Sequence, residues 1–402
     1  MKNLLILTYW SYKDPLIQTY TMPYVRIIKD NLPQKSKIYL LTIEQEFFRM
    51  SNEEWQKEKE KLQKENIHLI RFRYSKFGLK MGVKFIGIFA SLFFLTITKN
   101  ISKIHTWCTP AGAIGYILSV LTFKPLVIDS FEPHAEAMLE SKTWRKESFS
   151  FRLLFRMEYL QVKKAETVIA CVDKMKTHTQ KTYNVDIQKF YSIPACVNTE
   201  LFKNDSPNRS LVKSLGFESK IVCVYLGKLG GLYLEKEVFD FFKECSHFWG
   251  DKFRVLLLTT HTDNELKQYC KESGLDKNII ISKYVNHKDV PKYLGLASFA
   301  INPTKPVPSR RYGTPIKTAE YWAMGLPVVI TKEISDDSEI IEKEDIGYVL
   351  KELNQIEYKN AIVKVDKLLK QEPKTLKDKI RNIAVKYRSF TIAKKVYNEI
   401  YG

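Results

Sequence analysis

Short apolar runs recur along this 402-residue chain and alternate with segments of helical character. In the first half they cover 4–9, 38–42, 68–72, 104–107, 126–129, 167–171 and 190–194, and in the second half 221–226, 255–259, 279–282, 299–302 and 328–331. Several of these runs are continuously apolar, as expected for parallel strands that are covered on both faces. The pattern predicts an α/β chain with two parallel sheets.

A polar, turn-rich segment separates the two series of runs. It covers residues 202–210 and reads F-K-N-D-S-P-N-R-S, a composition typical of linkers. A chain of this length is also long for a single core. We predict two Rossmann-like domains, residues 1–205 and 211–386, which face a central cleft and bind ligands at the carboxyl ends of their strands.

The chain is strongly basic, with a formal net charge of +19 at pH 7. A basic surface suits an anionic partner such as nucleic acid, an acidic membrane face or a phosphorylated substrate, although Lys-rich helices also serve solubility alone. The sequence has no nucleic-acid-binding module, no RNP-like strand and no zinc-ligand spacing. Nucleic acid is therefore not the predicted partner.

The positions of the cysteines and the length of the apolar segments indicate the cellular compartment of the protein. The six cysteines are scattered, which fits a reducing cytoplasm better than a disulfide framework. The apolar segment 85–98 is shorter than the roughly 20 residues that a spanning helix needs. We predict a buried or interfacial helix there and a cytoplasmic protein. Peripheral association with the anionic inner face of the plasma membrane is a further expectation.

The strongest local pattern is the segment 312–331, which reads Y-G-T-P-I-K-T-A-E-Y-W-A-M-G-L-P-V-V-I-T. A polar loop opens a helix, the helix stops at Gly325, and a buried strand follows. A helix start offers unpaired backbone N–H groups and positive dipole charge, which favour an anion. Glu320, one turn into the helix, can accept two hydrogen bonds from a ribose diol. The alternative is a solvated acid that the helix dipole stabilises.

This segment resembles the donor site of the retaining family-4 glycosyltransferases of the GT-B fold. The loop, Lys317, Glu320, the G-L-P-V-V exit and the strand stand in the family's order. The resemblance implies that Glu320 holds the nucleotide ribose and that the backbone amides of Gly313 and Thr314 face the sugar or the diphosphate. Where the family has a glutamate that contacts the donor sugar, this chain has Tyr312, whose hydroxyl is the candidate contact.

The same resemblance implies an arrangement of the chain terminus. In GT-B enzymes a terminal helix crosses back onto the first domain. The segment 380–401 has apolar residues at helical spacing. Residues 387–402 are therefore expected to join the first domain.

A second candidate site is the glycine-rich turn 226–231, L-G-K-L-G-G, which directly follows an apolar run. Gly227 and Gly230 let the backbone approach a phosphate, and Lys228 can neutralise it. By the resemblance, Lys228 contacts the donor diphosphate. Relatives usually have a second basic residue where this chain has Tyr233. The candidates to replace it are Lys317, Arg310 and Arg311.

The first domain supplies one candidate catalytic residue, in the loop that follows the run 126–129. Relatives place a histidine in this loop, and His134 is its counterpart here. It would contact a sugar hydroxyl or take up the acceptor proton. Glu132 and Glu136 are further candidates, and a structural histidine at a helix start is the alternative.

These features together predict a glycosyltransferase that moves a sugar from a nucleotide diphosphate donor to a glycan or lipid-linked glycan, with retention, in bacterial surface polysaccharide synthesis. Lys228 and Lys317 would stabilise the departing diphosphate, so neither a metal nor another cofactor is expected. By resemblance, Tyr284 and Val285 would contact the nucleotide base.

Two alternatives stay open at this point. Because Tyr312 replaces the family's glutamate, the chain could be a GT-B protein of degenerate site, which binds nucleotide sugar or scaffolds an assembly complex without turnover. The other alternative is a nucleotide-sugar epimerase or a phosphorylase on the same fold. A glycogen-type phosphorylase would need a lysine that binds pyridoxal phosphate, and the sequence offers no convincing context for one.

Overall fold

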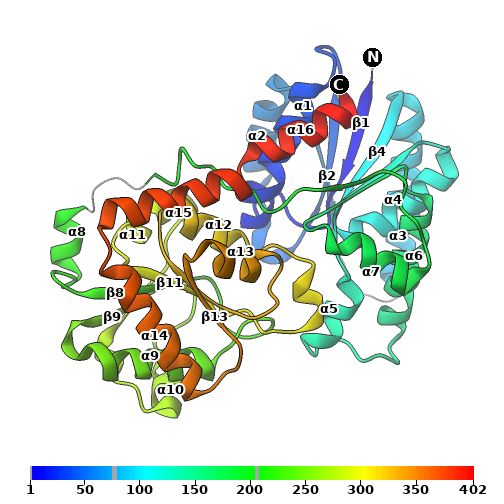
Figure 1. Ribbon diagram of the computed structural model, residues 1–402. Coiled ribbons are helices and arrows are strands. Elements are labelled where there is room, and N and C mark those ends of the chain that lie inside the picture. The colour runs from blue at the N-terminus through cyan, green and yellow to red at the C-terminus, as the bar shows by residue number, and fades with distance from the viewer. Residues whose placement is uncertain (1, 75–78, 204–207) are drawn as a thin grey trace. The chain divides into compact units, whose positions relative to one another are not determined.

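The computed structural model describes residues 2–74, 79–203 and 208–402 and, for residues 79–84, the backbone alone. The chain divides into two compact units (Figure 1). The first unit comprises Met1–Pro194 with Thr391–Gly402, and the second comprises Ala195–Phe390. Each unit holds a parallel sheet with helices around it, which confirms the predicted α/β class.

The first unit is built on a seven-stranded parallel sheet of the order β3-β2-β1-β4-β5-β6-β7. Its strands are β1 (Asn3–Leu7), β2 (Ile38–Glu44), β3 (Ile67–Arg73), β4 (Ile101–Trp107), β5 (Leu126–Phe131), β6 (Thr167–Ala170) and β7 (Phe190–Ser192). Every residue of β1 and β2 is buried, because helices cover both faces of the sheet. This explains why these strands read as continuous apolar runs rather than as alternating ones.

Helices connect the strands of this sheet. They are α1 (Met22–Asn31), α2 (Asn52–Lys64), α3 (Leu79–Thr98), α4 (Thr109–Thr122), α5 (His134–Glu140), α6 (Phe149–Lys164) and α7 (Lys174–Tyr183). Right-handed crossovers in this strand order place α1 and α2 on one face and α3, α4 and α6 on the other. Among the described residues, no helix combines the length and apolarity that crossing a membrane requires.

The C-terminal helix α16 (Phe390–Tyr401) belongs to the first unit, as the resemblance implied. Two tyrosines anchor it to the carboxyl-terminal halves of β4 and β5. Tyr397 Oη donates a hydrogen bond to Asp129 Oδ2 at 2.6 Å, and Tyr401 Oη lies 2.6 Å from Nδ1 of the buried His105. Burial of these four polar side chains is tolerated because each of them takes part in a hydrogen bond.

The second unit holds a six-stranded parallel sheet of the order β10-β9-β8-β11-β12-β13. Its strands are β8 (Ile221–Leu226), β9 (Phe253–Leu258), β10 (Ile280–Lys283), β11 (Phe299–Asn302), β12 (Val328–Thr331) and β13 (Gly347–Leu350). Its helices are α8 (Arg209–Ser214), α9 (Lys236–Trp249), α10 (Asp263–Ser273), α11 (Val290–Leu294), α12 (Ile316–Ala323), α13 (Asp337–Glu344), α14 (Gln355–Leu369) and α15 (Pro373–Arg388).

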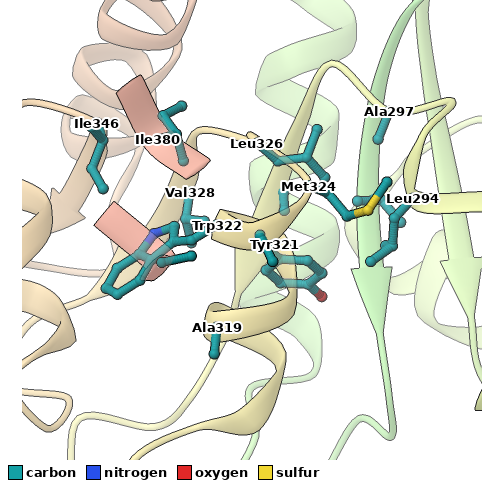
Figure 2. Close-up of a cluster of buried hydrophobic side chains, with 14 of the residues drawn as sticks. Leu294, Ala297, Ala319, Tyr321, Trp322, Met324, Leu326, Val328, Ile346 and Ile380 are labelled. Carbon is teal, nitrogen blue, oxygen red and sulfur yellow. The ribbon is translucent and has the colours of Figure 1, made fainter. Parts of the chain in front are cut away.

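Helix α12, the helix of the 312–331 segment, is enclosed by the core of this unit. All its residues from Lys317 to Ala323 are buried. Tyr321 and Trp322 project to different sides of the helix (Figure 2), and both belong to a cluster that includes Ile380 of α15. Packing on several sides fixes the position of α12, and with it the side chains that α12 carries toward the sheet edge.

The structure differs from the sequence expectations in three places. The strand β13 was not predicted, because G-Y-V-L is too short and mixed to stand out. The segment 380–401 is two helices, since the chain is extended at Ser389 between them. The division between the units lies at Pro194/Ala195, upstream of the predicted linker 202–210, of which residues 204–207 lie outside the described residues.

A hydrogen-bond bridge explains this position of the division. The guanidinium of Arg381, on α15, donates to the carbonyl oxygens of Thr199 and Phe202 at 2.7 and 2.8 Å. The side chains of Val197 and Phe202 are buried in the core of the second unit. The segment that directly follows Pro194 is thus part of that unit.

Candidate donor site and the loops of the first unit

The candidate donor site lies at the carboxyl edge of the second sheet, between β8 and β11. The chain leaves β8 toward β9 and leaves β11 toward β12, on opposite sides. Such a switch point is where open α/β sheets bind ligands. The loops after β8 and β11 meet there: Tyr233 and Thr304 form a bridge, and Leu234 N donates to Pro303 O at 2.8 Å.

Hydrogen bonds to the loop after β9 and to the end of β9 fix the glycine-rich loop after β8. Gly227 N donates to Leu258 O at 2.9 Å, and Leu229 N donates to Nε2 of His261 at 3.0 Å. Gly227 and Gly230 have φ values of 128° and 83°, which other residues adopt only with strain. Among the residues that the structure describes, the amides of Lys228 and Gly230 have no hydrogen-bond acceptor. Such amides can bind an anion.

Lys317 lies against this loop as a buried cation. Its Nζ is 3.8 Å from the ring centre of Tyr233 and 4.6 Å from that of Tyr225, and it donates to Tyr225 Oη at 3.2 Å. A β-carbon at Gly227 would lie 3.0 Å from this Nζ, so the missing side chain leaves room for the ammonium group. Burial opposes the charged form, but the two tyrosines outweigh it and raise the pKa of Lys317.

This geometry gives Tyr233 a role that the sequence comparison left open. Tyr233 stands where the resemblance led us to expect a second basic residue, and its ring covers the ammonium group of Lys317. A cation over an aromatic face is attracted to it without a counter-charge. Lys317 therefore keeps its charge for an external anion. Of the other candidates for this role, Arg311 forms an ion pair with Glu333 at 2.6 Å.

Buried polar side chains at the ends of β11 and β12 fix the start of α12. Asn302 Nδ2 donates to Thr318 Oγ1 at 2.8 Å, and Thr304 Oγ1 donates to Asn302 Oδ1 at 2.7 Å. Thr331 Oγ1 in turn donates to Thr304 O at 2.5 Å. The sequence analysis did not single out these residues. The available signal was a polar residue, Asn302, at the end of a buried apolar strand.

Glu320 has a partner that the sequence did not reveal. Its Oε1 lies 2.7 Å from Nε2 of His287, which follows β10. Glu320 is only 4% exposed, whereas His287 is partly exposed. The contact brings Glu320 next to the segment that holds Tyr284 and Val285, the predicted base contacts. Tyr284 is exposed, and Val285 is half-buried against the core.

The loop that carries Tyr312, Gly313 and Thr314 leads directly into α12. Tyr312 N donates to Ser309 O at 3.2 Å, and Thr314 Oγ1 lies 3.2 Å from the hydroxyl oxygen of Ser335. The three residues are half-buried. The structure thus gathers the predicted donor-site residues in the second unit, on the loops after β8, β10 and β11 and at the start of α12.

His134 belongs to the first unit, where it begins α5. Its Nδ1 lies 3.1 Å from Oε1 of Glu132, so Glu132 can set the orientation and tautomer of the ring. Glu158 on α6 accepts a hydrogen bond from Ala135 N at 2.9 Å and another from Tyr183 Oη at 2.8 Å. Burial raises the pKa of Glu158 to about 7. Glu158 thus holds the first turn of α5 in place.

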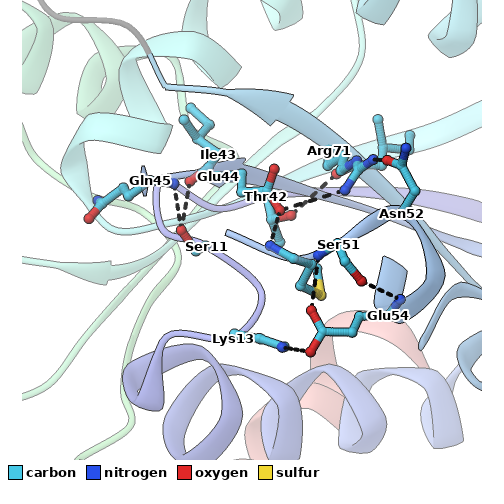
Figure 3. A network of polar contacts seen from close by, with 12 residues as sticks. Ser11, Lys13, Thr42, Ile43, Glu44, Gln45, Ser51, Asn52, Glu54 and Arg71 are labelled. Atoms are coloured by element: carbon cyan, nitrogen blue, oxygen red, sulfur yellow. Dashed lines mark hydrogen bonds and ion pairs between the residues drawn. The ribbon is translucent and has the colours of Figure 1, made fainter. Parts of the chain in front are cut away.

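The loop after β1 is fixed by a polar network at the same edge of the first sheet (Figure 3). Gln45 N donates to Ser11 Oγ at 2.6 Å, and Lys13 forms an ion pair with Glu54 of α2 at 2.5 Å. Met50 N donates to the buried Glu44 at 2.9 Å. These contacts tie the loop to β2 and to the start of α2.

Comparison with known proteins bears on the identity of the second unit. Residues 220–367 match the family model described as "Glycosyl transferases group 1". This range holds the glycine-rich loop, Lys317 and Glu320. The second unit is therefore similar to the group 1 glycosyltransferases over residues 220–367.

The structure of the whole chain is also similar to solved structures. Anabaena Alr3699/HepE in complex with UDP is 16% identical, with a TM-score of 0.73 over 100% of this chain and 99% of that chain. The lipopolysaccharide-biosynthesis glycosyltransferase WaaG is 14% identical, with a TM-score of 0.71 and complete coverage of both chains. The sucrose-phosphate synthase of Thermosynechococcus elongatus is 13% identical, with a TM-score of 0.71 and coverage of 100% and 98%. The whole chain thus has the GT-B fold. No curated protein matches it.

Proposed function

We propose that this protein is a retaining glycosyltransferase that takes its sugar from a nucleoside diphosphate donor. The observation that carries the proposal is Lys317, a buried cation held between two tyrosine rings beside Gly227. A preorganised charge in a dry site stabilises a developing anion far more than a solvated charge does. The departing diphosphate of a nucleotide sugar is such an anion.

The roles of the other residues follow from their positions. Lys228 is exposed on the glycine-rich loop and would close over the diphosphate, while the amide of Gly230 donates to it. Glu320 would accept hydrogen bonds from the ribose diol, with His287 holding its carboxylate. Tyr284 and Val285 would border the base. Tyr312, Gly313 and Thr314 would face the sugar.

In the proposed reaction the bond between the anomeric carbon and the diphosphate oxygen breaks, and an acceptor hydroxyl forms a bond on the same face of the sugar. The hydroxyl proton goes to the departing diphosphate or to His134, which Glu132 orients. Retention is proposed from the resemblance of the donor segment. The reaction needs no divalent cation, because Lys317 and Lys228 supply the positive charge. Excess EDTA should therefore leave the rate unchanged.

The acceptor is proposed to be a glycan or lipid-linked glycan of a bacterial surface polysaccharide, handled by a cytoplasmic protein at the membrane face. One similar structure is that of WaaG, a glycosyltransferase involved in lipopolysaccharide biosynthesis. UDP-sugars are the first donors to test, because the Anabaena HepE structures hold UDP, UDP with glucose, and UDP-glucose.

A second candidate function is a nucleotide-sugar-binding or scaffold protein without turnover. The observation that favours it is Tyr312, which stands where the resemblance expects a glutamate. Such a protein would bind UDP through Glu320 and Lys317 but would not consume UDP-sugar. The two functions therefore differ in turnover and agree in binding.

The test combines calorimetry with a donor-consumption assay. UDP, GDP, ADP and CMP are titrated into the wild type, Glu320→Gln and Glu342→Gln, an exposed acid on α13 that serves as the control. We expect one nucleotide to bind, and Glu320→Gln to weaken it at least tenfold, about 1.4 kcal/mol. Binding with donor consumption supports the transferase, and binding without it supports the scaffold. No binding of any nucleotide would contradict both.

A further inference from the structure

The helices α3, α4 and α6 of the first unit carry almost no negative charge. The sequence from Asn66 to Ile128, which includes α3 and α4, has no aspartate or glutamate but eight lysines and arginines. The one acid of α6 is Glu158. It is fully buried and serves as the acceptor for Ala135 N and Tyr183 Oη. The outer side of these helices is therefore positive or neutral wherever the structure describes it.

Large apolar side chains are exposed on the same helices. On α4, Ile117, Val120 and Leu121 recur at the spacing of one helix face, and all three are open to solvent. The exposed apolar side chains of the neighbouring helices are Ile86, Phe94 and Ile97 on α3 and Phe149 and Leu153 on α6. Contiguous apolar exposure of this kind marks an interaction site.

The three helices form one layer. α4 packs against both α3 and α6, and right-handed crossovers place all three on the same face of the first sheet. Figure 1 shows them together on that side of the sheet. Their outward sides therefore form one continuous surface, which we call the α3–α4–α6 surface.

The end of α4 provides an independent observation. Phe123, its C-cap residue, has φ 56° and ψ 20°, a left-handed conformation that glycine or asparagine adopts at lower cost than a bulky side chain. The ring of Phe123 is 89% exposed, so packing within the described part of the unit does not offset that cost. A strained residue that presents an aromatic ring outward points to a partner that receives the ring.

Cations border the apolar side chains. Lys99 follows α3, Lys124 follows α4, and Arg152, Arg156 and Lys163 lie on α6. On the opposite face of the sheet, α2 reads N-E-E-W-Q-K-E-K-E-K-L-Q-K and mixes both signs. Helices with apolar and cationic groups on one side bind the interface of an anionic bilayer. Two copies docked face to face through this surface would instead bring like charges together.

We propose that the α3–α4–α6 surface docks on an anionic lipid bilayer. Phe123 and the exposed side chains of α4 enter the boundary between headgroups and acyl chains, and the bordering cations contact lipid phosphates. The inference rests on the proposed function only for the purpose of the docking, which is to bring the first unit to a lipid-linked acceptor. The docking itself requires neither nucleotide nor turnover.

The experiment measures flotation of the 402-residue chain with vesicles of phosphatidylcholine, with and without about 30% phosphatidylglycerol. The variant Phe123→Asn removes the ring and suits the left-handed backbone, so it should unfold at the same or a higher temperature than the wild type. Phe47→Asn is the matched control, because Phe47 is also 89% exposed but precedes α2. A second variant, Leu121→Glu, adds a negative charge to the face of α4.

We expect the wild type and Phe47→Asn to float with the anionic vesicles and to dissociate in high salt. Phe123→Asn should bind at least threefold more weakly and Leu121→Glu at least tenfold. Binding of both variants equal to the wild type would overturn the proposal. So would absence of wild-type flotation, whether or not the protein self-associates through this surface. UDP binding should be the same in all four proteins, so its loss would contradict the proposed function and leave the docking result intact.

Discussion

Lys317 in the second unit and Glu158 in the first are both buried ionisable side chains, but their surroundings act on them in opposite ways. Lys317 lies between two tyrosine rings and beside a glycine. Burial opposes its charged form, but the two tyrosines raise its pKa and keep it charged. Glu158 accepts hydrogen bonds from a backbone amide and a tyrosine, and burial moves its pKa to about 7, toward the neutral form.

The difference separates a binding group from a structural one. A buried side chain that stays charged next to backbone amides without hydrogen-bond acceptors can bind an anionic ligand. A buried acid whose oxygens are used by neighbouring donors holds an element in place, here the start of α5. This difference in surroundings matches the roles proposed for the two units: anion binding in the second unit and positioning of an acceptor loop in the first.

The largest effect is expected from Lys317→Met, which keeps the length of the side chain and removes its charge. Transfer from the donor sugar should slow by about 10²- to 10³-fold, the loss typical of removing one preorganised group for a developing anion. The measurement is donor consumption at saturating acceptor. Lys332→Met, on an exposed lysine after β12, is the control and should act like the wild type. Full activity of Lys317→Met would show that Lys317, like Glu158, has a structural role and does not stabilise the departing diphosphate.

Next in size is the pH dependence due to Glu158. Its pKa of about 7 in the folded state lies above the ordinary carboxyl value, so the folded state binds the proton more tightly than the unfolded state does. The stability that Glu158 contributes is therefore present at low pH and is lost as pH rises through about 7. The total change is roughly 3 kcal/mol at most.

Glu158→Gln tests this effect, because glutamine keeps the acceptor for Ala135 N and does not titrate. Hydrogen exchange of α5 and α6 between pH 5 and 8, corrected for the intrinsic rate, should lose protection with rising pH in the wild type and stay level in the variant. Glu147→Gln, on an exposed acid before α6, should follow the wild type. Parallel profiles for wild type and Glu158→Gln would show that Glu158 stays ionised, like Lys317.

A smaller effect is expected from His287→Asn. The substitution removes the imidazole that lies 2.7 Å from Glu320, so the carboxylate of this nearly buried acid loses its orientation. UDP affinity should fall about three- to tenfold, roughly the worth of one ordinary hydrogen bond, because the carboxylate itself remains. His247→Asn, at an exposed histidine of α9, is the control for calorimetry. Unchanged affinity would mean that Glu320 needs no partner.

The smallest effect concerns the ring over Lys317. Tyr233→Leu removes the aromatic face that lies 3.8 Å from Nζ, at a cost of about 1 kcal/mol, and should slow turnover several-fold. Tyr233→Phe keeps the ring and should stay within about twofold of the wild type. If the two variants were equally slow, the hydroxyl rather than the ring would be what supports Lys317.

Much of the fold could be predicted because buried parallel strands leave a local mark in the sequence. The strands β8, β11 and β12 have the predicted bounds, since each is a continuous apolar run between turn residues. The strand β13 carries too few apolar residues for that signal. The break at Ser389 was also not predicted, because apolar residues at helical spacing continue across it.

The candidate site shows a similar limit. Lys317, Glu320 and the glycine-rich loop stand out because they sit in short, ordered segments. The contacts of Lys317 with Tyr225 and of Glu320 with His287 join residues that are distant in the sequence, on different elements. No local pattern encodes such contacts. The exposed ring of Phe123 likewise depends on a backbone conformation that its neighbours in the sequence do not indicate.

The most direct test of the account is calorimetric titration of UDP and UMP into the wild type and Lys317→Met at one ionic strength. If the buried ammonium group binds the diphosphate, the wild type prefers UDP over UMP by at least tenfold, and Lys317→Met loses most of that preference while it still binds UMP. An equal preference for UDP in both proteins would contradict the central claim, since the charge of Lys317 would then not be what the diphosphate meets.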